Sequence, residues 1–191
     1  MSFSSQTWVR RGIDILPPQK PTPPLTAAKW PLKMLAIAAI FLLSAVSLPS
    51  AEALEVSLNE QNLLELINQD RSVYGLPALT PDGRLTEAAG MKAEHMLAND
   101  YFAHTSPQGV RPWEFLDQAG FPYRSAGENL ALNYQNAYEL IEDFMQSPSH
   151  RANLLSADFQ EIGIAINAGE LDGENALVAV FMFGKEQNAA D

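Results

Sequence analysis

Hydrophobic residues recur at helical spacing in the two segments that follow residue 56. The first segment ends at Gly75, and Ser57 and Glu60 at its start have the spacing of a capping box. Its apolar stripe consists of Leu63, Leu64, Ile67 and Tyr74. The second segment covers residues 84–99, and one face of it carries Leu85, Ala88, Ala89, the aliphatic stem of Lys92 and Met96. Apolar positions three or four residues apart predict an amphipathic helix in both segments.

Two further helices are predicted downstream. One begins at Arg111 with Pro112 in its first turn, and it ends before Gly120, because glycine is favoured just past a helix C-terminus. The other spans residues 136–146 and is expected to direct four side chains inward, which are Tyr138, Ile141, Phe144 and Met145.

After residue 156 the hydrophobic period changes from helical to alternating. Ile162, Ile164 and Ile166 alternate with small or polar residues, which is typical of a strand. Residues 169–174 are rich in turn formers, and the apolar run 176–183 matches a strand that is covered on both faces. Helices followed by a hairpin predict an α+β fold, with helices packed over a mainly antiparallel sheet.

The N-terminal part of the chain has a different composition and predicts an export signal. The uncharged apolar run 34–48 follows Lys33, and Ala51 and Ala53 supply the small residues that a signal peptidase reads. This run is shorter than the roughly 20 residues of a membrane-spanning helix, so we expect cleavage after Ala53, with a retained signal anchor as the alternative. The chain thus divides into a proline-rich, basic extension that is expected to be disordered (1–33), the signal (34–53) and one domain (54–191).

Charge and cysteine content exclude several classes of protein. The chain carries a formal net charge of −11, and residues 54–191 carry 7 basic against 21 acidic residues. A nucleic-acid-binding domain needs a basic surface, so we exclude nucleic acid as a partner. The chain has no cysteine, which excludes disulfides, thiolate metal sites and a cysteine nucleophile.

Three residues of the 54–191 domain are candidates for chemistry. His104 and His150 each follow a predicted helix, and Glu128 lies in the segment Gly127–Asn129, which is expected to be extended. Two imidazoles and a carboxylate form a known ligand set for a divalent cation such as zinc. No zinc-protease helix motif, serine-hydrolase elbow, P-loop or dinucleotide fingerprint accompanies them. A purely structural His–Glu–His cluster is the alternative.

Four motifs in a fixed order resemble the CAP superfamily in its short bacterial form. This superfamily, also called SCP-like, comprises cysteine-rich secretory proteins, antigen 5 and pathogenesis-related proteins. The motifs lie at residues 102–107, 127–131, 147–155 and 159–165, and the similarity extends from about residue 63 to residue 184. The resemblance implies an α–β–α sandwich, an extracytoplasmic location and a cleft lined by two histidines and, in animal and plant members, two glutamates.

The resemblance places the family's cleft residues at His104, Glu128 and His150. The fourth position departs from the pattern, because Ser147 stands where the second glutamate is found and Phe144 replaces the tryptophan before it. A metal site here would therefore have three protein ligands. Neighbouring residues that are expected to orient the three are Ser106, Asn129, Ser147 and Arg151.

Three functional hypotheses follow. The first is a secreted, non-enzymatic module whose cleft binds a divalent cation or a small ligand such as a lipid. The second is a hydrolase that acts on peptide or cell-envelope substrates through a metal ion or a His–Glu pair. The third is an acidic surface protein that binds a protein partner and has a structural His–Glu–His cluster. Contact with a membrane is expected only if the apolar N-terminal segment is retained as an anchor.

Overall fold

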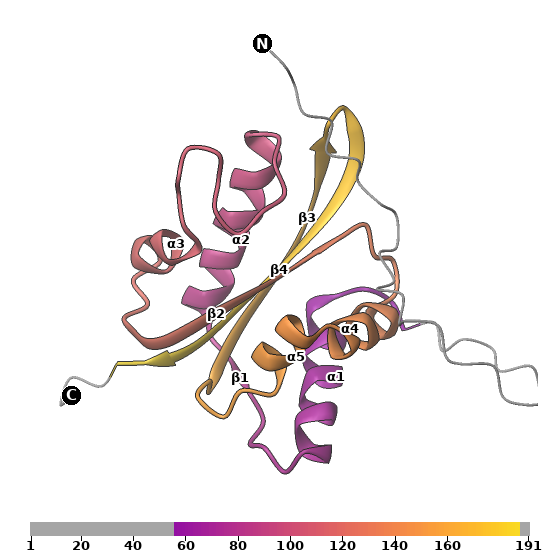
Figure 1. The fold of residues 1–191 in the computed structure, drawn as a ribbon, viewed down its shortest axis with the longest axis vertical. Helices are drawn as coiled ribbons and strands as arrows, with labels where there is room; N and C mark the ends of the chain where they lie inside the picture. The colour runs from indigo at the N-terminus through magenta and orange to yellow at the C-terminus, as the bar shows by residue number, and fades with distance from the viewer. Residues whose placement is uncertain (1–55, 188–191) are drawn as a thin grey trace, which may run out of the picture. The chain divides into compact units, whose positions relative to one another are not determined.

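The computed structural model describes residues 56–187, which form helices and strands in a mixed order (Figure 1). In chain order the elements are α1 (Glu60–Val73), β1 (Thr80–Pro81), α2 (Gly83–Ala98), α3 (Pro112–Gln118), β2 (Tyr123–Leu132), α4 (Ala137–Gln146), α5 (Pro148–Leu154), β3 (Glu161–Leu171) and β4 (Glu174–Glu186). Within this described part, no helix combines the length and hydrophobicity that crossing a membrane requires. The predicted signal and the extension before it lie outside the described residues.

The strands form one sheet in the order β1–β3–β4–β2. β4 lies inside the sheet and pairs antiparallel with β2 and β3, whereas the short β1 joins β3 in parallel. The β3–β4 hairpin turns at Asp172 and Gly173, whose φ angles of 52° and 75° suit a tight two-residue turn. Both strands therefore continue into the segment 169–174, which the sequence pattern had assigned wholly to the turn.

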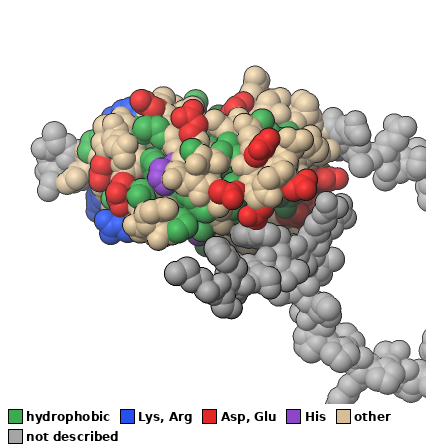
Figure 2. Space-filling view, turned by 90° about the horizontal axis from the view of Figure 1, so that it is seen from above, with side chains coloured by type: hydrophobic (Ala, Val, Ile, Leu, Met, Phe, Trp, Pro, Cys, Tyr) green, Lys and Arg blue, Asp and Glu red, His purple; other side chains and the backbone are tan. Residues whose placement is uncertain are grey.

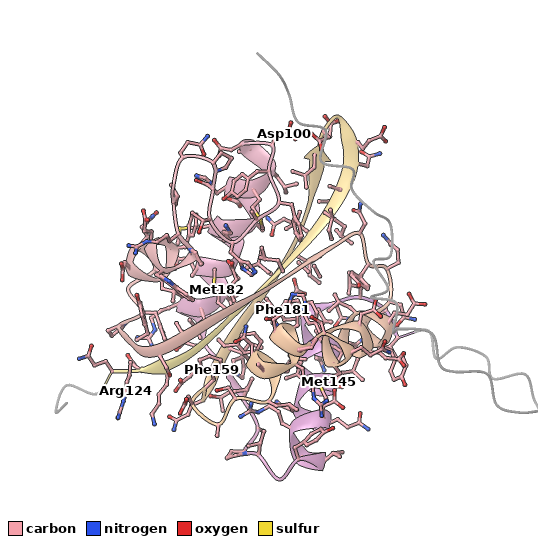
Figure 3. The ribbon with its side chains drawn as sticks, viewed as in Figure 1. Asp100, Arg124, Met145, Phe159, Phe181 and Met182 are labelled. Atoms are coloured by element: carbon pink, nitrogen blue, oxygen red, sulfur yellow. The ribbon has the colours of Figure 1, made fainter. Side chains whose placement is uncertain are left out.

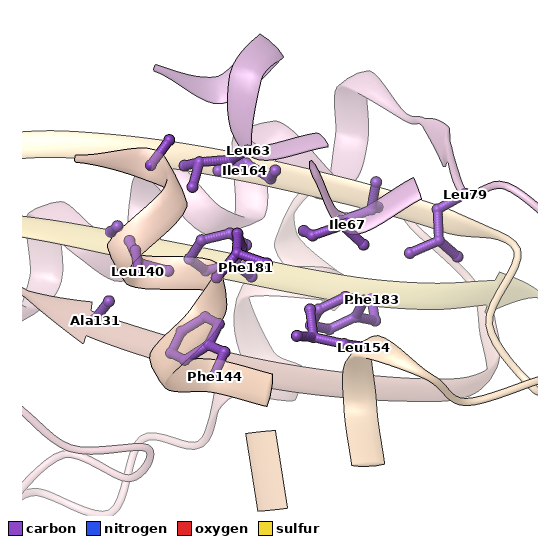
Figure 4. Packing of buried hydrophobic residues seen from close by; sticks show 14 of the residues in the cluster. Leu63, Ile67, Leu79, Ala131, Leu140, Phe144, Leu154, Ile164, Phe181 and Phe183 are labelled. Carbon is purple, nitrogen blue, oxygen red and sulfur yellow. The ribbon is translucent and has the colours of Figure 1, made fainter. Parts of the chain in front are cut away.

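Helices cover both faces of the sheet, and the side chains of β4 alternate between two cores (Figure 1). Phe181 and Phe183 pack with α1, α4 and α5, whereas Val180 and Met182 pack with α2 and α3. Figure 3 labels Phe181 and Met182, which are adjacent on β4, and Figure 4 shows the first of the two cores. The architecture is an α–β–α sandwich with a mainly antiparallel sheet, which confirms the predicted fold class.

The α2 helix lies in backbone contact with β3. A Cβ atom on Gly163 would stand 2.0 Å from the carbonyl carbon of Leu85 and 2.1 Å from the backbone nitrogen of Thr86. Only glycine leaves room for so close an approach. Each side chain predicted for the inner face of this helix is buried, and for Lys92 this includes the ammonium group as well as the stem.

The predicted N-cap of the first helix is wrong. α1 begins at Glu60 with Asn59 as its N-cap, so Ser57 does not form the capping box and instead pairs with Asn136 in an isolated bridge. The extended chain before Asn59 leaves Ser57 outside the helix, and the carbonyl group of the preceding Val56 accepts from the backbone of Ala137. The capping preference itself is satisfied, because the Asn59 side chain accepts from the backbone of Asn62.

Two tyrosines that were predicted to point inward are exposed, each for a different reason. Tyr74 is 50% exposed, because it follows the last residue of α1 as its C-cap. Tyr138 is 45% exposed, because the buried stripe of α4 is Ala137, Leu140, Ile141 and Phe144. This stripe keeps the spacing of one helix face, and Tyr138 lies beside it.

The α5 helix is an element that the hydrophobic pattern did not predict. Ser147 ends α4 and also precedes α5, where Pro148 occupies the first helical position. A helix of seven residues with one buried position, Leu154, is too short to show a period. His150, expected after the end of a helix, therefore lies within one.

Candidate functional site

Two adjacent residues of β2 point to opposite faces of the sheet. In the register of β2 with β4, Glu128 lies opposite Met182 and Asn129 lies opposite Phe181. Directly opposed residues of antiparallel strands share a face. Glu128 therefore points into the layer of α2 and α3, and Asn129 points into the layer of α1, α4 and α5. The segment Gly127–Asn129 is extended, as predicted.

On the α2 side, His104 contacts Glu128 directly. The His104 Nδ1 atom lies 2.6 Å from Glu128 Oε1. The two side chains differ sharply in exposure, since that of Glu128 is 2% exposed and that of His104 is 59% exposed. An ionised carboxylate can only accept hydrogen bonds, so Nδ1 donates and the Nε2 atom remains for another partner. The pair thus joins a buried carboxylate to an imidazole that reaches the surface.

The loop between α2 and α3 carries His104 and is tied at both ends. Its later part closes on Ser106, whose hydroxyl accepts from the backbone of Gln108 at 3.2 Å and of Val110 at 3.0 Å. Its earlier part is held by Lys92, whose Nζ donates to the carbonyl oxygens of Ala103 at 2.8 Å and His104 at 2.7 Å. Ser106 therefore organises the loop through the loop's backbone, and these hydroxyl bonds do not reach Glu128.

Burial dominates the electrostatics around Glu128. It raises the pKa of the Glu128 carboxyl, while the hydrogen bond to His104 and the charge of Lys92 act in the opposite direction. Burial lowers the pKa of Lys92, and burial together with the nearby Glu128 charge raises the pKa of Tyr101 to about 12. One carboxylate oxygen, Glu128 Oε2, is buried and has no hydrogen-bond partner among the described residues.

Acidic and basic side chains are distributed differently on the surface and in the interior. Acidic side chains are spread over the face in Figure 2, whereas Lys and Arg gather toward one end of it. Within residues 56–187 the buried side chains of the Lys, Arg, Asp and Glu types are Arg71, Lys92 and Glu128. Two of these three, Lys92 and Glu128, lie close enough for each to affect the pKa of the other group.

On the opposite side, Asn129 joins a satisfied amide network. Its Nδ2 donates to the carbonyl oxygen of His150 at 3.1 Å, and its Oδ1 accepts from Asn153 Nδ2 at 2.7 Å. The Asn153 amide also donates to the Glu128 carbonyl oxygen at 3.0 Å. These bonds fasten α5 to the strand that carries Glu128. Asn129 thus contacts His150 through the backbone carbonyl of that residue and not through its imidazole.

His150 packs its ring against a neighbouring aromatic side chain. The centroids of the His150 and Phe144 rings lie 4.6 Å apart. Burial lowers the pKa of His150, and the charge of His104 lowers it further. The charge of His104 therefore acts on His150, although the two residues approach β2 from opposite layers.

Ser147 and Arg151 contribute less to this arrangement than expected. Ser147 connects α4 to α5 and makes no side-chain capping bond. Arg151 is exposed and donates to the hydroxyl of Tyr74 at 2.9 Å, with its guanidinium over the Tyr74 ring. Neither has a hydrogen bond to His104 or Glu128 within the described residues.

The described residues contain no group of three His, Asp or Glu side chains positioned to hold a metal ion. His104, Glu128 and His150 therefore do not assemble into the three-ligand cation site that their residue types favour. A surface hollow of about 390 Å³ lies instead along α4 and α5, where neither His104 nor Glu128 lines it. Its lining residues are Met145, Gln146, Pro148, Arg151, Ala152 and Leu155.

Three residues of the site were not identified from the sequence. Lys92 and Tyr101 hold the His104 loop, and Asn153 links α5 to β2. A lysine at a core position of an amphipathic helix was a usable signal for Lys92, since lysine is rarely buried without a specific partner. Tyr101 and Asn153 gave no such signal.

The α–β–α sandwich, with Glu128 on the edge strand β2 and His104 on the loop between α2 and α3, defines a class, the CAP-type domain. The sequence profile of the cysteine-rich secretory protein family matches residues 64–183, and the chain belongs to this family. Two relatives come from Bacillus subtilis, the uncharacterized protein YkwD, which is 35% identical over 109 residues, and the uncharacterized membrane protein YlbC, which is 31% identical over 109 residues. Each match covers 57% of this chain but 42% of YkwD and 32% of YlbC, so this chain spans less than half of either relative.

Solved structures show the same fold. An extracellular protein with an SCP domain from Bacillus anthracis is 27% identical, with a TM-score of 0.56 over 66% of this chain and 40% of that one. An outer surface protein from Borrelia burgdorferi is 22% identical, with a TM-score of 0.58 over 69% of this chain and 98% of that one. The second likeness concerns the fold alone. These structurally similar proteins are extracellular or on the outer surface.

Proposed function

We propose that this chain is a secreted, non-enzymatic binding module whose His104–Glu128 pair takes a small ligand with an N–H or O–H donor. The observation that carries the proposal is the Oε2 atom of Glu128, which is buried without a donor among the described residues. A buried acceptor without a partner costs about 1–3 kcal/mol. A ligand that supplies the donor recovers this free energy on binding.

The exposure of the two side chains supports a route for such a ligand. The carboxylate is shielded, whereas the His104 ring is 59% exposed and stands on a loop. A small displacement of this ring opens Glu128 to solvent. The Nε2 atom of His104 then offers a second polar contact, and two polar contacts fix the orientation of a small ligand.

Secretion is supported by the apolar run 34–48 with its basic flank, and by the extracellular and outer-surface proteins that share the fold. N-terminal sequencing of the protein recovered from culture supernatant tests this part. A start at Leu54 is expected. A product that stays in the membrane fraction with its N-terminus intact contradicts cleavage and favours the anchor.

The ligand hypothesis is tested by titration with ethanolamine, which carries hydroxyl and ammonium donors, and in parallel with zinc chloride. Binding is followed through the NMR signals of His104 and His150. We expect saturable ethanolamine binding that Glu128→Gln weakens about tenfold or more. The matched control is Glu161→Gln, because Glu161 also has a buried Oε2 without a partner and lies elsewhere on the sheet.

Three results contradict the proposal. Ethanolamine that does not bind, or that binds Glu128→Gln as tightly as the wild type, removes the donor role of the ligand. Zinc binding that requires His104, Glu128 and His150 together replaces the small-molecule ligand by a divalent cation. Equal loss of binding in both variants indicates an effect of stability alone.

A hydrolase is the second candidate, and the geometry of the pair is what favours it. A carboxylate bound to Nδ1 leaves Nε2 of the imidazole free to take a proton from water, which is the orientation of a general base. Hydrolysis of casein and of purified bacterial cell wall is the measurement. A turnover that Glu128→Gln abolishes, with substrate affinity unchanged, supports the enzyme over the binding module.

A further inference from the structure

A lysine buried inside the protein reaches the backbone of the site. The Lys92 side chain is 0% exposed, and its Nζ atom has three oxygen acceptors, which are the carbonyl groups of Ala103 and His104 and the hydroxyl of Tyr101. The same ammonium lies 5.0 Å from the centre of the Tyr101 ring and 5.8 Å from that of Phe115. All three hydrogen bonds that an ammonium can donate are therefore used.

Moving an ammonium from water into the interior costs free energy, which its hydrogen bonds must offset. Two of the Lys92 acceptors belong to consecutive residues of the loop, and the second of them is His104 itself. A side chain of α2 thus holds the backbone of His104 in place.

A second contact from the same helix strengthens this attachment. His95 lies three residues after Lys92, so both side chains are on one face of α2. Its Nδ1 atom lies 2.9 Å from the Tyr101 hydroxyl, which also accepts from Lys92 at 3.2 Å. The start of the loop is therefore attached to α2 at Tyr101. The hydrogen bonds from Lys92 to the carbonyl groups of Ala103 and His104 extend this attachment along the loop.

We propose that Lys92 is a positioning residue, whose ammonium group holds the backbone of Ala103 and His104 so that the imidazole of His104 meets the carboxylate of Glu128. The inference rests on the proposed function for its biological purpose, since the pair it positions is the pair that would bind the ligand. The geometric part stands on the hydrogen bonds alone. Lys92 does not touch the ligand in this scheme.

The test compares two buried cations, one on each side of the sheet. Lys92→Met removes the donors to the His104 loop. The matched control is Arg71→Met, because Arg71 is 1% exposed and donates to three carbonyl oxygens in the other layer, those of Pro77, Leu154 and Ser156. Both variants lose a buried cation and leave carbonyl groups without donors, so both are destabilised. The Nδ1–H proton of His104, detected by NMR under conditions where each variant is fully folded, separates them.

We expect Lys92→Met to raise the exchange rate of this proton with water about tenfold or more, since its bond to Glu128 is no longer held closed. Arg71→Met is expected to leave the rate within about twofold of the wild type. A rate that is unchanged in Lys92→Met overturns the proposal. An equal rise in both variants also overturns it, because a general loosening of the fold then explains the effect.

A second variant covers the case in which Lys92→Met does not fold. Lys92→Gln keeps an amide that can donate to one of the two carbonyl groups, and it is expected to give an exchange rate between those of the wild type and a fully released loop. A wild-type rate in Lys92→Gln overturns the proposal. The proposed function can fail independently of this inference. If ethanolamine does not bind the wild-type protein, the proposed function fails, but the exchange rate of the His104 proton still depends on Lys92.

Discussion

Two neighbouring polar residues of β2, which point to opposite faces of the sheet, differ in whether their hydrogen bonds are satisfied. Glu128 enters the α2 layer, where one of its oxygens is paired with His104 and the other has no partner among the described residues. Asn129 enters the α5 layer, where both ends of its amide are bonded. Polar groups that serve the fold are satisfied, whereas a buried group left unsatisfied is a candidate for binding. The comparison thus assigns structure to one face and ligand chemistry to the other.

The largest expected effect tests the structural face. Arg71→Met removes the donors to three carbonyl oxygens, two of which end the segment containing α5. We expect a loss of roughly 3–5 kcal/mol in the free energy of unfolding, because each buried acceptor is left without a partner. Urea denaturation followed by circular dichroism measures it. A loss below about 1 kcal/mol would show that water replaces the guanidinium and that α5 is not held by Arg71.

The next prediction sets the two adjacent residues against each other. Asn129→Ala breaks the bonds to His150 and Asn153, so we expect it to destabilise the protein by about 2 kcal/mol. Glu128→Gln at pH 7 is expected to change stability by less than about 1 kcal/mol, or to increase it, because it removes a buried charge. Thermal and urea unfolding of both variants and of the wild type measure these changes in stability. A larger loss in Glu128→Gln than in Asn129→Ala would falsify the assignment of the two faces.

The pH dependence of Glu128→Gln sharpens this prediction. Burial raises the pKa of Glu128 in the folded protein, so the folded state binds the proton more tightly than the unfolded state. This contribution to stability is therefore present below the unfolded value of 4.5 and is lost as the pH rises through the folded pKa. The wild type should lose stability over this range relative to Glu128→Gln. Parallel curves for the two proteins contradict the burial of an ionisable group.

A smaller effect of opposite sign is expected from His150. Burial and the charge of His104 lower its pKa below 6.5 in the folded state, so the unfolded state binds the proton more tightly. Stability is then lost as the pH falls from 6.5 through the lowered folded value. His150→Phe retains a ring against Phe144 and is expected to remove this part of the acid sensitivity. Melting temperatures measured between pH 7 and pH 5 in both proteins provide the comparison.

The smallest expected effect concerns the exposed residues of the α5 side. Arg151→Ala loses a hydrogen bond and a ring contact to Tyr74, both at the surface. We expect a change of at most about 0.5 kcal/mol in stability and none in the His104 signal, because solvent screens such contacts. A substantial change in ethanolamine binding by Arg151→Ala would instead place the ligand near the hollow along α4 and α5.

The sequence predicted those parts of the site that depend on local pattern. The stripe on α2 was correct down to its individual residues, since a sixteen-residue helix repeats its period several times. The extended Gly127–Asn129 segment was also expected. The family resemblance placed His104, Glu128 and His150 in one cleft, but it did not predict the hydrogen bond between His104 and Glu128. The α5 helix was not, because seven residues begun by Pro148 show no period. A three-ligand cation set was suggested by residue types, which carry no information about distance.

By itself, then, the sequence determined four of the five helices in the described residues, the closing hairpin, the acidic surface and the family, because periodicity, charge and motif spacing are properties of the chain. The tertiary structure decided which residues meet. The alternation of β2 sends Glu128 and Asn129 to separate layers, where Glu128 meets His104, 24 residues away, and Asn129 meets the backbone of His150, 21 residues away. The buried Lys92 ammonium bonds to the carbonyl group of His104, 12 residues away. Such contacts join residues far apart in the chain, and they form only when packed layers bring those residues within hydrogen-bond distance.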